Sequence, residues 1–169
     1  ATVYTKKQSV SIAGYGEMLY EDFDHQSDVD ASSQPIDQLD FLRAVIYFGY
    51  RFNDRFLFNS EIEIEHANTD HGGEVSVEFA HVDYLMNDSL SLRGGRVLVP
   101  MGLLNEFHEP TIFLGARRTE TEQFVIPTTW RENGFGIFGR HGIIDYRAYL
   151  MNGLNAGGFN AEEGLHEGR

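Results

Sequence analysis

Three glutamates at alternate positions, Glu61, Glu63 and Glu65, are the clearest group of chemically active side chains in this sequence. Alternate residues of a β-strand point to one side and lie about 7 Å apart, so the three carboxylates would form a row. Like charges in such a row repel one another, and they need water, cations or facing arginines. The row therefore indicates either a wall that attracts cations or a self-neutralising ladder, with Arg43 and Arg51 as suitable partners.

The residues around this row alternate between apolar and polar types, which predicts a β-hairpin over residues 39–66. Asn53-Asp54 is typical of the tight turn between its two strands. A hairpin with one apolar face and one ionised face suits two kinds of protein. It belongs either to a soluble sandwich or barrel, or to a membrane barrel whose apolar face contacts lipid and whose charged face lines water.

Seven alternating segments follow one another along the chain, with no sign of a second domain. We expect strands at about residues 10–21, 38–52, 55–66, 75–86, 89–99, 130–140 and 143–152. Tight turns at Asn53-Asp54, Asn87-Asp88 and His141-Gly142 alternate with longer connections. In an up-and-down meander all short turns then lie at one end, as in outer-membrane barrels. The predicted fold is all-β, an antiparallel up-and-down transmembrane β-barrel.

Seven strands do not make a complete barrel of this kind, because single-chain bacterial barrels normally have an even number of about 8 or more. An open edge in lipid would also leave backbone groups without partners. The loop-like residues 166–169 at the end of the chain agree with this view. We therefore expect residues 1–169 to form one domain that is the N-terminal portion of a larger barrel.

Composition excludes several classes of partner. The net charge of −13 and the pI near 4.8 argue against binding to nucleic acid or to an anionic membrane surface. The absence of cysteine excludes disulfides and thiolate chemistry. No apolar run approaches the roughly 20 residues of a membrane-spanning helix, so a membrane role would fall to strands.

A water-filled barrel would carry its polar side chains on the inner wall. The pore-lining residues that we expect are Arg43, Tyr47, Arg51, Glu61, Glu63, Glu65, Asp83, Asp145 and Arg147.

The long segment 100–129 is a second candidate site, because loops of this length in a compact fold are usually functional. Its apolar residues indicate that it packs against another part of the protein. Its charged residues and histidine are Glu106, His108, Glu109, Arg117, Arg118, Glu120 and Glu122. The segment is either a constriction element of mixed charge inside the barrel or an external loop packed on the rim or on a neighbouring subunit.

Two other patterns do not carry a site. His66 and His71 lie near Asp70, but the histidines are scattered, and a metal needs three or four converging ligands. The glycines of residues 134–139 match a dinucleotide pattern, but a turn and a strand follow where that chemistry needs a helix. We interpret them as places where a strand bends or a neighbouring aromatic covers it. We predict no metal, no cofactor and no enzyme activity, because no acid, base and nucleophile converge.

Several longer runs carry a family resemblance. They are residues 14–17 (GYGE), 78–84 (EFAHVDY), 90–102 (LSLRGGRVLVPMG), 105–110 (NEFHEP), 126–134 (IPTTWRENG) and 152–156 (NGLNA). In this order they resemble the N-terminal half of the phosphate-selective porin O and P family. The resemblance implies a diffusion channel of the Gram-negative outer membrane with roughly 16 strands, usually a trimer. Phosphate selectivity in that family rests on rows of lysine and arginine, whereas this chain has Glu61, Glu63 and Glu65, so only the fold and the pore function carry over.

The sequence thus predicts an outer-membrane porin, a passive channel for small hydrophilic solutes or ions with a weak preference for cations. Its expected partners are outer-membrane lipid, the solutes and, as a homotrimer, further copies of the chain. One alternative is a non-conducting barrel that serves as a scaffold or sleeve for an envelope protein complex. The other is a soluble all-β binding module, for carbohydrate for example, in which the apolar face is a core.

Overall fold

The structure, a computed structural model, describes residues 9–23, 37–66, 73–102, 104–112, 118, 119, 121, 125–127, 129–161, 164, 165 and 168. The strands are β1 (Val10–Glu21), β2 (Gln38–Arg51), β3 (Phe56–Glu65), β4 (Glu74–Asn87), β5 (Leu90–Leu98), β6 (Arg131–His141) and β7 (Ile144–Met151). A short 3₁₀ helix, η4 (Ala156–Gly158), follows them. None of the described helical residues forms a helix long and apolar enough to cross a membrane.

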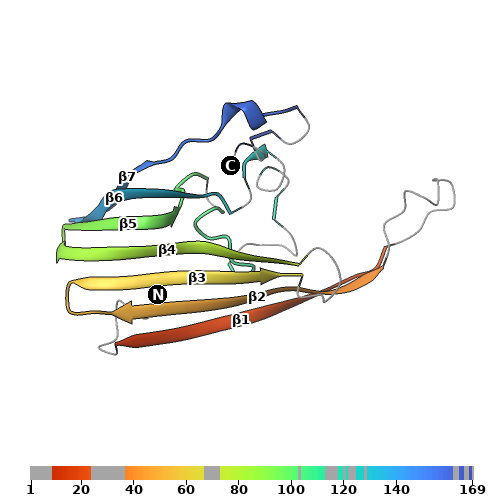
Figure 1. The fold of residues 1–169 in the computed structure, drawn as a ribbon, viewed down its shortest axis with the longest axis horizontal. Helices are drawn as coiled ribbons and strands as arrows, with labels where there is room; N and C mark the ends of the chain where they lie inside the picture. Colours follow the sequence, from red (N-terminus) through yellow and green to blue (C-terminus); the bar gives the residue numbers. More distant parts are fainter. Residues whose placement is uncertain are drawn as a thin grey trace.

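The seven strands form one open sheet in the order of the chain, and each strand is antiparallel to its neighbours (Figure 1). Every strand begins and ends within one residue of the predicted bounds. The all-β, antiparallel meander expected from the alternation of residue types is therefore confirmed.

The three tight turns lie at one end of the sheet, at the left of Figure 1, and the longer connections leave from the other end. Asn53 and Asn87 build two of these turns in the same way. Each asparagine side chain accepts hydrogen bonds of 2.9 Å from the backbone N–H groups two and three residues later. In the third turn Gly142 takes a φ of +62°, which favours glycine. The predicted segregation of short and long connections is confirmed.

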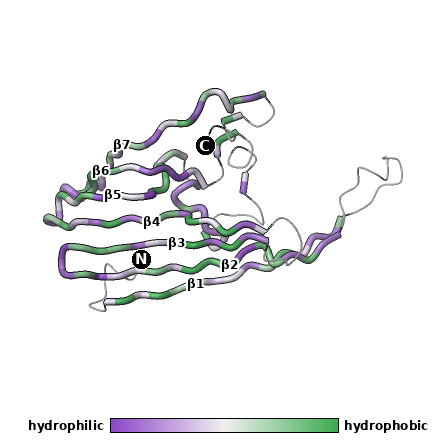
Figure 2. Tube along the Cα trace, viewed as in Figure 1, coloured by the Kyte–Doolittle hydropathy of each residue, from purple (hydrophilic) through white to green (hydrophobic). Residues whose placement is uncertain are grey.

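The two faces of the sheet are opposite in character, and the polar face is the buried one. On the apolar face Ile12 is 71% and Leu150 is 66% exposed. On the polar face Glu61, Glu63 and Asp83 are 1%, 2% and 0% exposed. The alternation of the two types along each strand is visible in Figure 2. A sheet in a water-soluble protein ordinarily has the reverse arrangement.

A β-bulge in β4 adds Glu78 to the polar face. Glu61 pairs with Phe79 and the next residue of β3 pairs with Val77, so Glu78 is an extra residue in the ladder. The alternation expected across residues 75–86 is interrupted here, because strict alternation would place Glu78 beside Ala80 on the apolar face. The bulge turns the carboxylate inward, where its side chain is buried.

The glycines of residues 134–139 lie inside β6, within the sheet. A Cβ on Gly136 would lie 2.2 Å from the Ala148 carbonyl oxygen and 2.4 Å from Cδ1 of Tyr149. This position requires glycine because the neighbouring strand and its aromatic ring approach so closely. The interpretation of these glycines as strand positions covered by an aromatic is confirmed at Gly136.

Candidate functional site

Asn105 fastens the base of the long segment between β5 and β6. Its Nδ2 donates to the carbonyl oxygens of Val99, at 2.7 Å, and Trp130, at 2.8 Å, and its Oδ1 accepts from the Trp130 backbone N–H at 2.6 Å. The two ends of the segment are thereby joined through one buried side chain. This clip holds the following residues, among them His108 and Glu109, against the polar face of the sheet.

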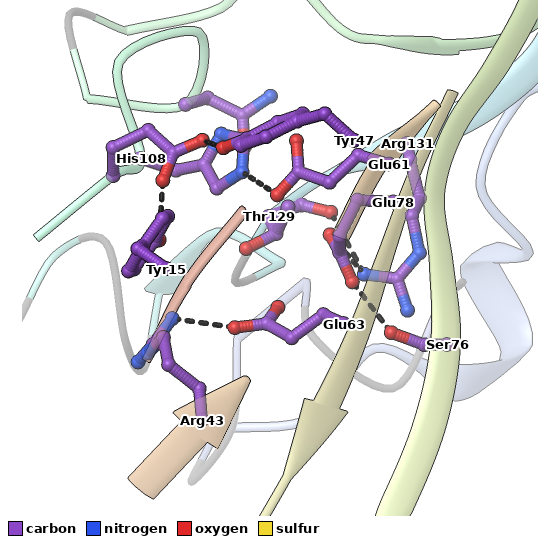
Figure 3. Close-up of polar contacts among 12 residues, drawn as sticks. Tyr15, Arg43, Tyr47, Glu61, Glu63, Ser76, Glu78, His108, Thr129 and Arg131 are labelled. Carbon is purple, nitrogen blue, oxygen red and sulfur yellow. Dashed lines mark hydrogen bonds and ion pairs between the residues drawn. The ribbon is translucent and has the colours of Figure 1, made fainter. Parts of the chain in front are cut away.

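Glu109 bridges this segment to the first two strands. Tyr15 of β1 donates a hydrogen bond to its Oε2, and Tyr47 of β2 donates one to its Oε1 (Figure 3). Burial raises the pKa of Glu109, and the hydrogen bond from Tyr15 and the charges of Arg43 and Arg118 act in the opposite direction. The carboxyl group therefore lies in a place where negative charge is costly.

His108 points at the glutamate row from the same segment. Its Nε2 lies 3.4 Å from Oε1 of Glu61, and the two side chains are 4% and 1% exposed. Among the described residues, Glu61 Oε2 and His108 Nδ1 have no hydrogen-bond partner. Glu61, His108 and Glu109 each bring one ligand-type atom within 4.8 Å of the others.

Arginines neutralise the carboxylates beside this group. Arg43 of β2 contacts Glu63 at 2.8 Å through Nη1 and Glu17 at 2.8 Å through Nε. Arg131, at the start of β6, contacts Glu78 at 2.8 Å, and the Ser76 hydroxyl donates to the same carboxylate at 2.6 Å (Figure 3).

Arg118 adds a third cation from the long segment. Its Nη1 donates to Oγ1 of Thr129 at 2.8 Å and its Nη2 donates to the carbonyl oxygen of His108 at 3.2 Å. Burial and the neighbouring charge of Arg43 lower its pKa, against the attraction of nearby glutamates. Arg118 thus supports the backbone that carries His108.

We call this group the loop cluster. It comprises Tyr15, Glu17, Arg43, Tyr47, Glu61, Glu63, Ser76, Glu78, His108, Glu109, Arg118, Thr129 and Arg131. Its five carboxylates exceed its three arginines, so the cluster is a region of negative charge. A cavity of about 390 Å³ lies between the segment and the sheet, and Tyr47, Glu61, His108 and Glu109 are among its lining residues.

The rest of the polar face, toward the tight turns, is organised differently. Arg93 of β5 holds Asp83 of β4 with two hydrogen bonds of 2.8 Å, one to each oxygen. Arg140 binds Asp145 at 2.6 and 2.9 Å in the same manner. Each carboxylate here has its own arginine. We call this second group, which comprises Asp83, Arg93, Arg140 and Asp145, the turn cluster.

The structure brings seven of the sixteen predicted site residues together in one group. Arg43, Tyr47, Glu61, Glu63, His108, Glu109 and Arg118 all belong to the loop cluster. Glu106 of the segment contacts Arg147 at 2.6 Å, which links the segment to β7 at the edge of the sheet. The register places Glu65 opposite Arg43 and Arg51 opposite Leu57. Asp83 and Asp145 lie in the turn cluster.

Three predicted loop residues, Arg117, Glu120 and Glu122, lie outside the described residues. So do His71 and Asp70 of the histidine pattern that was considered for a metal. His66 of that pattern contacts Asp40 through Nδ1 at 2.6 Å.

Six residues that build this site were not among the candidates from the sequence. They are Tyr15, Glu17, Glu78, Asn105, Thr129 and Arg131. Three of them left a detectable sign. Tyr15 and Glu17 have the spacing of one strand face, and the change of phase between Val77 and Ala80 marks the bulge that turns Glu78 inward. Asn105 and Thr129 left none, because their partners are set by how the long segment folds.

One similar protein is an uncharacterized protein of Aquifex aeolicus, strain VF5. It is 46% identical over 157 residues, which cover 91% of this chain and 34% of that protein. The chain thus spans about a third of the length of the relative that it matches. No family model matches the chain, and no solved structure matches it significantly.

Proposed function

We propose that this chain is part of an outer-membrane porin, a β-barrel that passes small hydrophilic solutes or ions and prefers cations weakly. The observation that carries the proposal is the inverted sheet, with bare apolar side chains on one face and buried carboxylates on the other. Exposed apolar surface costs about 25 cal/mol per Å² in water, and lipid removes that cost. The charged face would then look into the barrel.

The distribution of aromatic side chains on the apolar face supports a position in a bilayer. Phe56 packs on Tyr84, with ring centroids 4.7 Å apart, and Tyr50 meets Phe52 edge to face at 4.9 Å. These rings lie beside the tight turns, where barrels carry the aromatic girdle of one membrane interface. The strands have 8 to 14 residues, compared with the 9 to 11 or so that span a membrane when tilted.

The open sheet supports a larger barrel. Lipid leaves the backbone groups of a free strand edge without partners, so further strands must pair with β1 and β7. The relative from Aquifex aeolicus is long enough to supply them, since this chain covers 34% of it. The resemblance of the sequence to phosphate-selective porins O and P agrees with such a barrel.

The charge of the loop cluster supports a preference for cations. Its carboxylates outnumber its arginines, and a wall of one sign enriches the opposite ion. Glu61 and Glu109 face the cavity between the segment and the sheet, so the segment would act as the constriction. Phosphate selectivity has no support in this part of the wall.

The test is the reversal potential of the full-length protein in a planar bilayer under a gradient of potassium chloride. We expect steady conductance and a potential that favours potassium. A potential that favours chloride would contradict the cation preference and return anion transport to consideration.

A non-conducting barrel that holds an envelope protein partner is the second candidate. It is favoured by the burial of Asn105 and His108, because a segment packed this closely on the wall can close a narrow lumen. A folded barrel that inserts in the bilayer but carries no current would support this candidate and contradict the porin.

A further inference from the structure

Glu61 and His108 of the loop cluster each have a buried polar atom that needs an explanation. Glu61 is 1% exposed and His108 is 3% exposed, and Glu61 Oε2 and His108 Nδ1 have no partner among the described residues. A buried polar atom without a partner costs free energy, and nearly all such atoms in native proteins are satisfied. A cation bound by the Glu61 carboxylate would satisfy its Oε2, whereas His108 would bind the cation through Nε2, the nitrogen that faces Glu61, and not through Nδ1.

The contact between these two side chains is too long for a good hydrogen bond. Nε2 of His108 and Oε1 of Glu61 are 3.4 Å apart, whereas N–H···O bonds are usually about 2.7 to 3.2 Å. Two ligands of one tetrahedral zinc ion, each about 2.0 to 2.1 Å from the metal, lie about 3.4 Å apart. The observed separation therefore agrees with that of two ligands on one ion.

Glu109 completes a set of three. Its ligand oxygen lies within 4.8 Å of the Glu61 and His108 ligand atoms, compared with about 3.4 Å between two ligands of one tetrahedral ion. Shortening this distance by at most about 1.4 Å would bring the oxygen into contact with the same ion. Tyr15 and Tyr47 hold its two oxygens from β1 and β2, in the manner of the outer partners that orient metal-binding carboxylates.

We propose that Glu61, His108 and Glu109 bind one divalent transition-metal ion of the zinc type. One imidazole and two carboxylates are the donors that such ions take in open sites, and water fills the remaining positions. The adjoining cavity of about 390 Å³ leaves room for that water and for entry of the ion. The sequence alone predicted no metal, because its histidines are scattered along the chain and a metal needs three or four converging ligands.

The neighbouring carboxylates explain why the site lies here and not along the whole row. Arg43 satisfies Glu63, and Arg131 with Ser76 satisfies Glu78. Glu61 has no arginine contact among the described ion pairs, and its partner among those pairs is the imidazole of His108. The site does not depend on conduction, and it would also exist in a barrel that is closed.

The test is a zinc titration of the full-length protein in detergent, followed by calorimetry, with Glu61→Gln and His108→Gln as the variants. We expect one zinc ion per chain at this site, and a loss of affinity of at least about 10- to 100-fold in each variant, since loss of an outer partner alone typically costs that much. Asp145→Asn is the matched control, because it changes a carboxylate of the same polar face that lies in the turn cluster and is held by Arg140. Its affinity for zinc should equal that of the native protein.

Zinc K-edge absorption of the native protein decides the matter if a variant fails to fold. One nitrogen and several oxygens at about 2.0 to 2.1 Å would agree with the proposal. A first shell with two or more imidazoles would place the ion elsewhere and overturn it, as would equal binding in the Glu61→Gln variant or no stoichiometric binding. The bilayer experiment is separate, so failure of the metal site and failure of the porin give different results.

Discussion

The loop cluster and the turn cluster are built from the same residue types on the same face of one sheet, yet their charges are arranged differently. In the turn cluster Asp83 and Asp145 are each held at both oxygens by a single arginine. In the loop cluster Arg43 is divided between Glu17 and Glu63, and Glu61 contacts only a histidine among its described ion pairs.

The difference indicates that the two ends of the polar face have different roles. Matched pairs with two hydrogen bonds satisfy their own charge and need nothing further, so the turn cluster is suited to holding strands together. A region with more carboxylates than arginines keeps a demand for positive charge. The loop cluster is therefore the part of the wall suited to bind or attract cations, and variants of the two clusters should have separate effects.

Asp83→Asn should have the largest effect on stability. The change leaves the Arg93 guanidinium without its carboxylate in a half-buried place, and breaking such a pair costs about 3 kcal/mol. Urea unfolding of the full-length protein in lipid vesicles measures this loss. Asp145→Asn removes an equivalent pair that is exposed and should leave the unfolding midpoint unchanged. A variant Asp83→Asn as stable as the native protein would contradict a structural role for the turn cluster.

Tyr47→Phe should weaken zinc binding about tenfold while leaving the fold intact. The change removes one of the two hydroxyl donors that orient Glu109. Loss of such an outer partner typically lowers metal affinity about 10- to 100-fold. We expect the smaller loss because the Tyr15 hydroxyl still holds Glu109. Calorimetric zinc titration measures it. Tyr149→Phe, which removes a hydroxyl that contacts Arg93 in the turn cluster, is the control and should bind zinc normally. Equal losses of zinc affinity in both variants would contradict the proposal that only the loop cluster binds the metal.

The triple variant of Glu61, Glu63 and Glu65 to glutamine should have the smallest effect. We expect the ratio of potassium to chloride permeability to fall about two- to threefold, since salt near 0.1 M screens the wall beyond about 10 Å. The reversal potential before and after the change measures this ratio. An unchanged reversal potential would contradict a contribution of Glu61, Glu63 and Glu65 to ion selectivity.

The strands and turns followed from the sequence because they depend on local rules. A period of two places residues on one face whatever the rest of the chain does, and Asn53 and Asn87 close their turns through bonds to residues two and three positions later. The position of Glu61 and Glu63 on the polar face of the sheet followed for the same reason. One local rule failed at Glu78, because a bulge shifts the phase of the strand by one residue.

The sequence by itself therefore determined the sheet, its order of strands and the composition of its two faces. Only the tertiary structure decided how the long segment packs on the polar face of the sheet. Asn105 joins the ends of that segment, and Glu109 lies 62 residues beyond Tyr47 and 94 beyond Tyr15 in the chain. Contacts over such separations follow no periodicity, because they depend on the path of a loop. The meeting of Glu61, His108 and Glu109 is a property of that path.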